Sequence, residues 1–316
     1  MGLELERVRF RAMGSPCVLH FHAPSRIDAK RVADGVVGEV RRLEAKYSRY
    51  RDDSLVSAIA RSAGSASGID VDDETASLLD HAATCFAQSE GRFDVTSGVL
   101  RRAWDFRSGR VPDQREVDAV LELVGWERVV WARPRLRLPR PGMELDLGGV
   151  VKEYAVDRCV GLLRDLGVEH SLVDLGGDLG IAGPHPDGAP WTIGVRDPFE
   201  RGEALLTIDI ARGAVATSGD YERGMTIGDR RYTHVLDART GWPVEGVASV
   251  TVVAPHCTVA GSVSTIAMLL GRERCGPWLA DLGLPHVSVL ADGEVAGTLA
   301  PRVAESVASR PAVAAA

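Results

Sequence analysis

The chain has 316 residues, a formal net charge of −7, and 45% hydrophobic and 26% charged residues. This length suits one large domain or two closely packed lobes with an ample core. The negative charge, without a stripe of basic residues, argues against nucleic acid as a partner. No apolar run is long enough to cross a bilayer, so we expect no membrane span.

The N-terminal pattern and the cysteines bear on the cellular compartment. Residues 8–13 alternate like a strand and carry charges, so they do not resemble the apolar core of a secretory signal. The five cysteines show no Cys-x-x-Cys spacing, which favours scattered reduced thiols over disulfides or a zinc site. We therefore expect a cytoplasmic protein.

Apolar periodicity predicts helices and strands in mixed order. The expected helices are residues 27–47, 73–89, 114–124, 154–166 and 257–271. The expected strands are residues 8–22, 171–174, 191–196, 204–210, 215–217 and 247–254, short strands around Val129 and Leu136, and a hairpin of residues 287–290 and 295–299 around Asp292-Gly293. This order indicates an α+β fold with a mainly antiparallel sheet. No linker divides the chain, so we expect one domain over residues 1–300 and a flexible tail over residues 301–316.

The segment Glu144–Asp157 is the most informative part of the chain. An apolar run ends in the pair Gly148-Gly149 and then opens a helix that carries Lys152. Free backbone N–H groups at a helix start, together with a lysine, suit a phosphate-bearing ligand. Taken alone, the segment is better explained as an ordinary strand-to-helix turn.

Other motifs occur in the same order as in a known family. They are Met13-Gly14-Ser15, residues 91–98 (GRFDVTSG), residues 217–223 (TSGDYER) and residues 232–243 (YTHVLDARTGWP). With the segment above, they resemble the FAD:protein FMN transferases, the ApbE-like flavin transferases, from about Met13 to Gly271. The resemblance implies an α+β, ApbE-like architecture related to the T-fold, with mainly antiparallel sheets and packed helices. It also implies that FMN passes from FAD to a Ser or Thr hydroxyl of a flavin-accepting protein, with release of AMP and with Mg²⁺ as the metal.

The resemblance also assigns roles to individual residues. The expected FAD contacts are Met13, Tyr50, Asp94, Asp146, Lys152 and Thr217. Metal ligands are expected at the Gly149 backbone carbonyl and at Thr265. His234 is the expected base, because a histidine can accept a hydroxyl proton near neutral pH. His20 and His22 share one face of a strand, and without an evident third ligand they are interpreted as structural.

Three positions depart from the family pattern. The metal-binding helix normally reads Ala-Asp-Ala-x-(Ser/Ala)-Thr, whereas residues 260–265 read AGSVST, so Gly261 stands where the aspartate is expected. Glu153 follows Lys152 where glycine is usual, and Ala60 stands where an asparagine is expected. A carboxylate in the first turn of a helix explains Glu153 simply. The alternative is that Glu153 replaces the lost metal ligand, directly or through a bound water.

Other functions stay open at this point. With water as the acceptor, the protein would be an FAD pyrophosphatase, and release of FMN without an acceptor protein would reveal it. A degenerate member would bind FAD without turnover, and Gly261 is the main support for that alternative. The fold could also serve other chemistry, because fold does not determine function.

Overall fold

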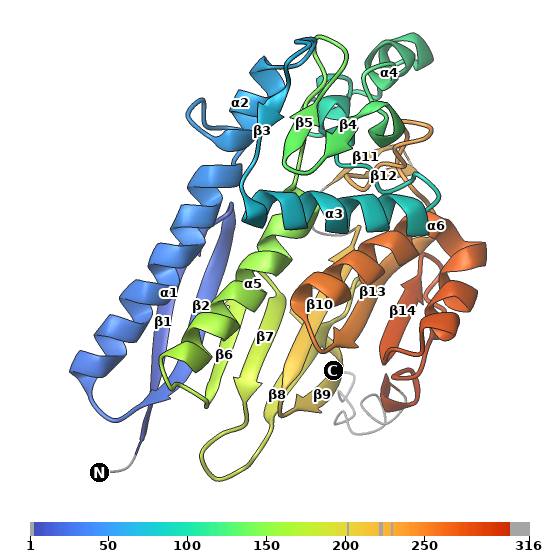
Figure 1. The fold of residues 1–316 in the computed structure, drawn as a ribbon. Coiled ribbons are helices and arrows are strands. Elements are labelled where there is room, and N and C mark those ends of the chain that lie inside the picture. The colour runs from blue at the N-terminus through green and yellow to red at the C-terminus, as the bar shows by residue number, and fades with distance from the viewer. Residues whose placement is uncertain (1–2, 201, 221–223, 229, 304–316) are drawn as a thin grey trace.

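The computed structural model describes residues 3–200, 202–220, 224–228 and 230–303. Its centre is an eight-stranded sheet in which all neighbouring strands are antiparallel, in the order β1-β2-β6-β7-β10-β13-β14-β15 (Figure 1). These strands are β1 (Glu4–Ala12), β2 (Ser15–Ala23), β6 (Ser171–Leu175), β7 (Asp178–Gly183), β10 (Gly213–Gly219), β13 (Val247–Ala254), β14 (His286–Leu290) and β15 (Val295–Ala296).

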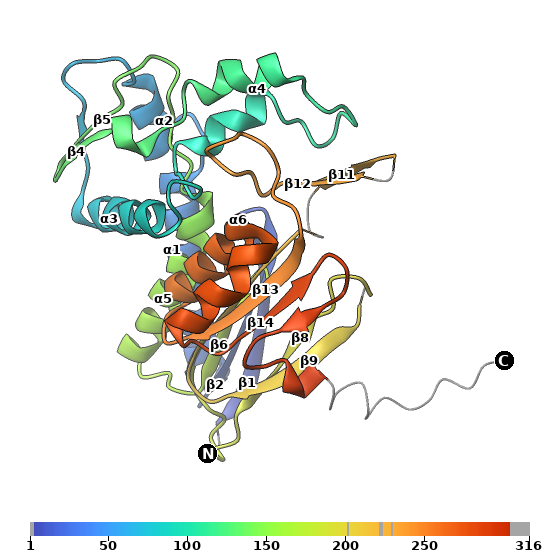
Figure 2. The ribbon, with the colours of Figure 1, turned by 90° about the vertical axis from the view of Figure 1, so that its right-hand side faces the viewer.

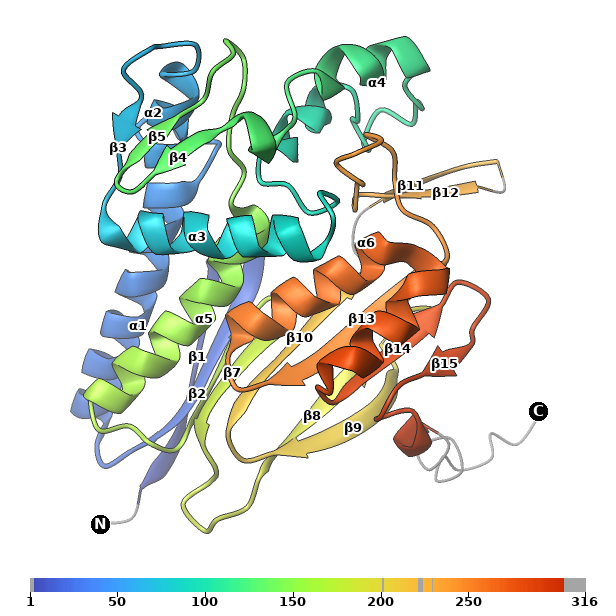
Figure 3. The ribbon, with the colours of Figure 1, turned by 45° about the vertical axis from the view of Figure 1, so that its right-hand side comes forward.

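Three long helices cover one face of this sheet (Figures 1 and 3). They are α1 (Arg26–Tyr47), α5 (Gly148–Asp165) and α6 (Cys257–Leu282). Val36, Val40 and Leu43, which share one side of α1 at helical spacing, are fully buried in the main core. The amphipathic pattern thus directs α1 onto the sheet.

A two-stranded hairpin covers the opposite face of the sheet (Figure 2). It consists of β8 (Trp191–Arg196) and β9 (Ala204–Ile210). Their buried side chains form a second core with Leu179 and Ile181 of β7. All six residues of β7 are buried, because this central strand is covered on both faces.

Smaller elements gather at one end of the sheet (Figures 1 and 3). They are α2 (Leu55–Arg61), α3 (Asp73–Gln88), α4 (Gln114–Leu121), the 3₁₀ helices Ser97–Arg102 and Trp126–Arg128, and a sheet of β3 (Ile69–Asp70), β5 (Arg135–Arg137) and β4 (Val130–Ala132). A separate ribbon is formed by β11 (Gly224–Ile227) and β12 (Arg230–Thr233).

The fold class is α+β with antiparallel sheets, as predicted. Three details differ. Helix α5 begins at Gly148 and not at residue 154, because the glycine pair lies inside the helix. Helix α6 continues past Gly271, whose φ of 72° interrupts it, to Leu282. Strands β7, β11 and β12 were not expected.

The sequence also predicted reduced cysteines, no membrane-spanning segment and a C-terminal tail. All five cysteines are free and buried. None of the helices that the structure describes combines the length and apolar composition that a bilayer crossing requires. The tail predicted over residues 301–316 lies outside the described residues from residue 304 onward.

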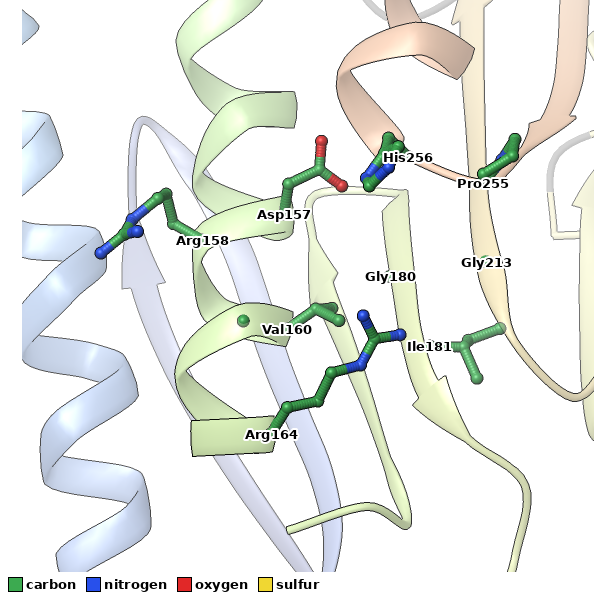
Figure 4. Close-up of a pocket in the computed structure, with 10 residues that line it drawn as sticks. Asp157, Arg158, Val160, Arg164, Gly180, Ile181, Gly213, Pro255 and His256 are labelled. Atoms are coloured by element: carbon green, nitrogen blue, oxygen red, sulfur yellow. The ribbon is translucent and has the colours of Figure 1, made fainter. Parts of the chain in front are cut away.

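The start of α6 is fastened by a side chain from α5. The Asp157 carboxylate accepts hydrogen bonds from the Cys257 backbone N–H (2.7 Å), the Thr258 backbone N–H (2.9 Å) and the Thr258 hydroxyl (2.6 Å). Figure 4 shows Asp157 reaching from α5 toward His256, beside a pocket of about 250 Å³ between α5, β7 and the start of α6. None of the predicted site residues lines this pocket.

We expect Asp157→Ala to lower the free energy of unfolding by about 2–3 kcal/mol, because two partly buried N–H groups at a helix start lose a charged acceptor. Urea unfolding monitored by circular dichroism measures this loss. Asp165→Ala, at an exposed position near the end of the same helix, is the matched control and should change stability by less than about 0.5 kcal/mol. Equal unfolding midpoints for the two variants would contradict the role of Asp157.

Candidate functional site

An ion pair between α5 and β7 lies at the centre of the candidate site. The Lys152 ammonium lies 2.6 Å from a carboxylate oxygen of Asp178, which is 3% exposed. The Thr217 backbone N–H of β10 also lowers the pKa of Asp178, although burial raises this pKa overall. Burial alone would lower the pKa of Lys152, but the carboxylates of Asp178 and Glu153 outweigh it and raise the pKa above its ordinary value. Lys152 therefore stays protonated at neutral pH.

Glu153, the next residue along α5, packs against Gly261 of α6. Its side chain is buried, and its Oε2 atom has no hydrogen-bond partner among the described residues. A Cβ atom built on Gly261 would collide with Cγ of Glu153 and lie 3.1 Å from its Cδ and Oε1 atoms. Burial and then the Asp178 carboxylate raise the pKa of Glu153 well above its ordinary value. The Glu153 carboxyl group thus occupies the space that a side chain at position 261 would fill.

The position of Glu153 in α5 decides whether its carboxyl group interacts with the helix dipole. The interaction with the helix dipole requires a carboxylate in the first turn. Because α5 begins at Gly148, Glu153 is the sixth residue of the helix, and no acidic residue lies in its first turn. The helix-dipole explanation is therefore wrong for Glu153. Its burial and its contact with α6 require another reason.

Hydroxyl groups connect the end of β10 to α6 beside this pair. The Ser218 hydroxyl lies 2.9 Å from the hydroxyls of Ser264 and Thr265. The neighbouring Thr217 hydroxyl lies 2.8 Å from that of Thr251 on β13. Ser218 thus joins the end of β10 to Thr265 of α6, whereas the Thr217 hydroxyl is joined to β13. The roles of Lys152, Thr217 and Thr265 in binding stay predictions.

The residues around Glu153 determine whether a magnesium ion fits at this place. Within the part of the chain that the structure describes, no group of three His, Cys, Asp or Glu side chains is placed to hold a metal ion. Mg²⁺ does not require one, because it keeps several waters and uses one or two carboxylates plus substrate phosphate oxygens. The unpartnered oxygen of Glu153, with Gly261 leaving room for it, fits an ion that binds together with a phosphate.

A second part of the site surrounds Tyr50, just after α1. Tyr50 is 79% exposed, and the Arg49 guanidinium lies over its ring at 5.1 Å from the centroid. Arg49 also pairs with Asp146, whose Oδ1 atom accepts the Gly148 N–H at 2.9 Å. Asp146 thus connects the exposed aromatic ring to the start of α5. No role in the site was predicted for Arg49, although it directly precedes Tyr50 in the sequence.

The structure places two further predicted FAD contacts outside this cluster of charges. Asp94 is buried and accepts hydrogen bonds from the Thr96 N–H (2.7 Å), the Thr96 hydroxyl (2.6 Å) and the Trp126 N–H (2.8 Å). These bonds order the loop of Asp94 and join it to the 3₁₀ helix that begins at Trp126, and the contact of Asp94 with FAD stays a prediction. Met13 lies in the turn between β1 and β2 with a φ of 51°, and its N–H donates to Glu44 at 2.6 Å.

His234 lies directly after β12 and is exposed. Figures 2 and 3 show β11 and β12 between α4 and α6. The loop that follows is held by the Trp104 indole, which donates to the Gly241 carbonyl at 2.7 Å. The ring of Trp104 also packs against Tyr232 and Trp242. The segment that carries His234 is therefore positioned by a buried aromatic contact.

Comparison with known proteins identifies the family of this chain. Residues 13–290 match the model of the ApbE family. The FAD:protein FMN transferase of Vibrio cholerae serotype O1 is 29% identical over 263 residues, covering 81% of this chain and 78% of the relative. That of Chlamydia pneumoniae is 33% identical over 235 residues, covering 72% of each. The crystal structure of the ApbE protein from Thermotoga maritima matches with a TM-score of 0.85 at 29% identity, over 98% of this chain and 100% of that one. The chain therefore belongs to the ApbE family.

Proposed function

We propose that this protein transfers FMN from FAD to a Ser or Thr hydroxyl of an acceptor flavoprotein and releases AMP. The observation that carries the proposal is the placement of Lys152 and Glu153 on α5: Lys152 pairs with the buried Asp178, and Glu153 packs against Gly261 of α6. The Ser218 hydroxyl at the end of β10 lies 2.9 Å from that of Thr265, which is also on α6. A protonated amine beside an unpartnered carboxyl oxygen suits a pyrophosphate that binds with a cation. The relatives named above carry the same activity.

In the proposed reaction, the acceptor hydroxyl oxygen bonds to the phosphorus of the FMN half of FAD. The bond from that phosphorus to the bridging oxygen breaks, and this oxygen leaves on AMP. His234 takes the hydroxyl proton, and Lys152 stabilises the charge that develops on the leaving phosphate. Tyr50, with Arg49 over its ring, offers an exposed surface on which a ring of FAD stacks.

A magnesium ion would be held by Glu153, by the Thr265 hydroxyl and by the Gly149 carbonyl, and it would neutralise pyrophosphate charge as the bond breaks. The binding-only alternative rests on the glycine at position 261. Because Glu153 occupies the space beside that glycine, the site keeps a carboxyl group at this place. This arrangement favours an active transferase over a decayed binding protein.

Replacing the proposed base should separate catalysis from binding. We expect His234→Ala to slow transfer about 10²–10⁴-fold and to leave FAD affinity nearly unchanged, because one imidazole adds little to the binding of so large a ligand. The measurement follows the mass of a Ser/Thr acceptor peptide and the release of AMP. His256→Ala, an exposed histidine at the start of α6, is the control. Transfer at the wild-type rate by His234→Ala would show that another group is the base, and free FMN without peptide would indicate a pyrophosphatase.

The stacking surface gives a prediction about affinity. We expect the protein to bind FAD more tightly than FMN, and Tyr50→Ala to weaken FAD binding by about 1 kcal/mol, roughly fivefold, through loss of an aromatic contact. A fluorescence titration measures both affinities. Phe199→Ala, an exposed aromatic residue between β8 and β9, should bind FAD as the wild type does. Equal losses in the two variants would exclude a specific role for Tyr50.

The contact between Glu153 and Gly261 gives a prediction about the metal. We expect Glu153→Gly to weaken Mn²⁺ binding in the presence of FAD at least about tenfold, as measured by electron paramagnetic resonance. Gly261→Asp alone should lower thermal stability, because its side chain collides with Glu153. The double variant should recover both properties. Additive effects in this cycle would show that the two positions do not substitute for each other.

A further inference from the structure

A group of histidines lies on the face of the sheet opposite the helices. Leu19 and Phe21 of β2 are buried in the core beneath the helices, so the alternating His22 points to the other face, toward β8. There it meets His185, from the connection between β7 and β8, and His170, just before β6. The ring centroids of His22 lie 5.5 Å from that of His185 and 6.3 Å from that of His170.

The rings of this group are held in place by their surroundings. The His22 backbone N–H donates to the His170 carbonyl at 3.0 Å. The His185 N–H donates to the Ala189 carbonyl at 2.9 Å, and its ring packs on Trp191 at 3.9 Å between centroids. The His170 Nδ1 atom lies 2.7 Å from the Pro184 carbonyl oxygen, which can only accept, so Nδ1 carries a proton. The arrangement therefore needs little reordering to bind a ligand.

The distance between two ring nitrogens is the decisive feature. His22 Nε2 and His185 Nδ1 lie 3.2 Å apart. Two nitrogens at that separation can both bind one ion at about 2.0–2.1 Å, with an angle of roughly 100° at the metal, close to tetrahedral.

We propose that His22 and His185 form a two-histidine site for a transition metal ion such as Zn²⁺ or Ni²⁺. Imidazole nitrogen suits these ions, whereas Mg²⁺ prefers oxygen. Because no three such side chains among the described residues are placed to hold one ion, water fills the other positions. The bound ion connects the β7–β8 connection to β2, on the opposite face from the Glu153 site, and it stabilises the folded chain by mass action.

The test is a calorimetric titration of the full chain, first stripped with a chelator, with Zn²⁺ in excess Mg²⁺. The proposal expects one Zn²⁺ per chain and at least a tenfold loss of affinity in His22→Gln and in His185→Gln. His20→Gln, two residues away on the same face of β2, should bind Zn²⁺ like the wild type. If His22→Gln does not fold, His185→Gln, in a connection between strands, gives the same result.

Two outcomes would overturn the proposal. The first is Zn²⁺ binding of wild-type affinity in both His22→Gln and His185→Gln, which would place the ion elsewhere. The second is the absence of Zn²⁺ binding by the wild type, which would leave the 3.2 Å contact as a hydrogen bond between the two rings.

Discussion

The buried ion pair between Lys152 and Asp178 is the constraint on which the rest of the site depends. Breaking a buried pair by removing one partner leaves an uncompensated charge and is strongly unfavourable. The pair therefore fixes the first turns of α5 against the start of β7. The same helix carries Asp157 five residues later, and Asp157 sets the start of α6. The carboxylates of Asp178 and Asp157 therefore hold α5, which carries Glu153, against β7 and against α6, which carries Thr265.

The charge balance of this region determines which ligands it accepts. One amine faces two carboxyl groups, Asp178 and Glu153, and burial raises the pKa of both. A buried carboxyl group with a raised pKa gains a strong partner when a cation arrives, because the cation favours its ionised form. Lys152, held by Asp178, supplies the positive charge that an incoming phosphate requires. A cation and a phosphate that bind together are therefore accommodated better than either one alone.

Much of the fold was readable from local patterns. The boundaries of β8, β9 and β13 agree with the prediction because their apolar and β-branched residues end at clear turn signals. Strand β7 was missed because it follows two glycines and is buried on both faces, so it shows no alternation. The start of α5 was placed too late because Gly148-Gly149 was interpreted as a turn, whereas packing keeps the pair helical.

The site was predictable only where a motif marked it. The motifs predicted roles for Lys152, Thr217 and Thr265, but not the ion pair of Lys152 with Asp178, because a charge partner on another strand leaves no local signal. His22 was interpreted as structural for the same reason: His185 comes 163 residues later.

The contact between Glu153 and Gly261 also restricts how this chain could have diverged from relatives with an aspartate at position 261. Consider an ancestor with glycine at position 153 and aspartate at position 261. A mutation to glutamate at position 153 alone would bring two acidic side chains into a space that holds one. A mutation to glycine at 261 alone leaves a cavity and no carboxylate. Each single step crosses a less fit intermediate, so the two positions should change together in a lineage. Sequences descended from this one should therefore keep or lose both residues as a pair.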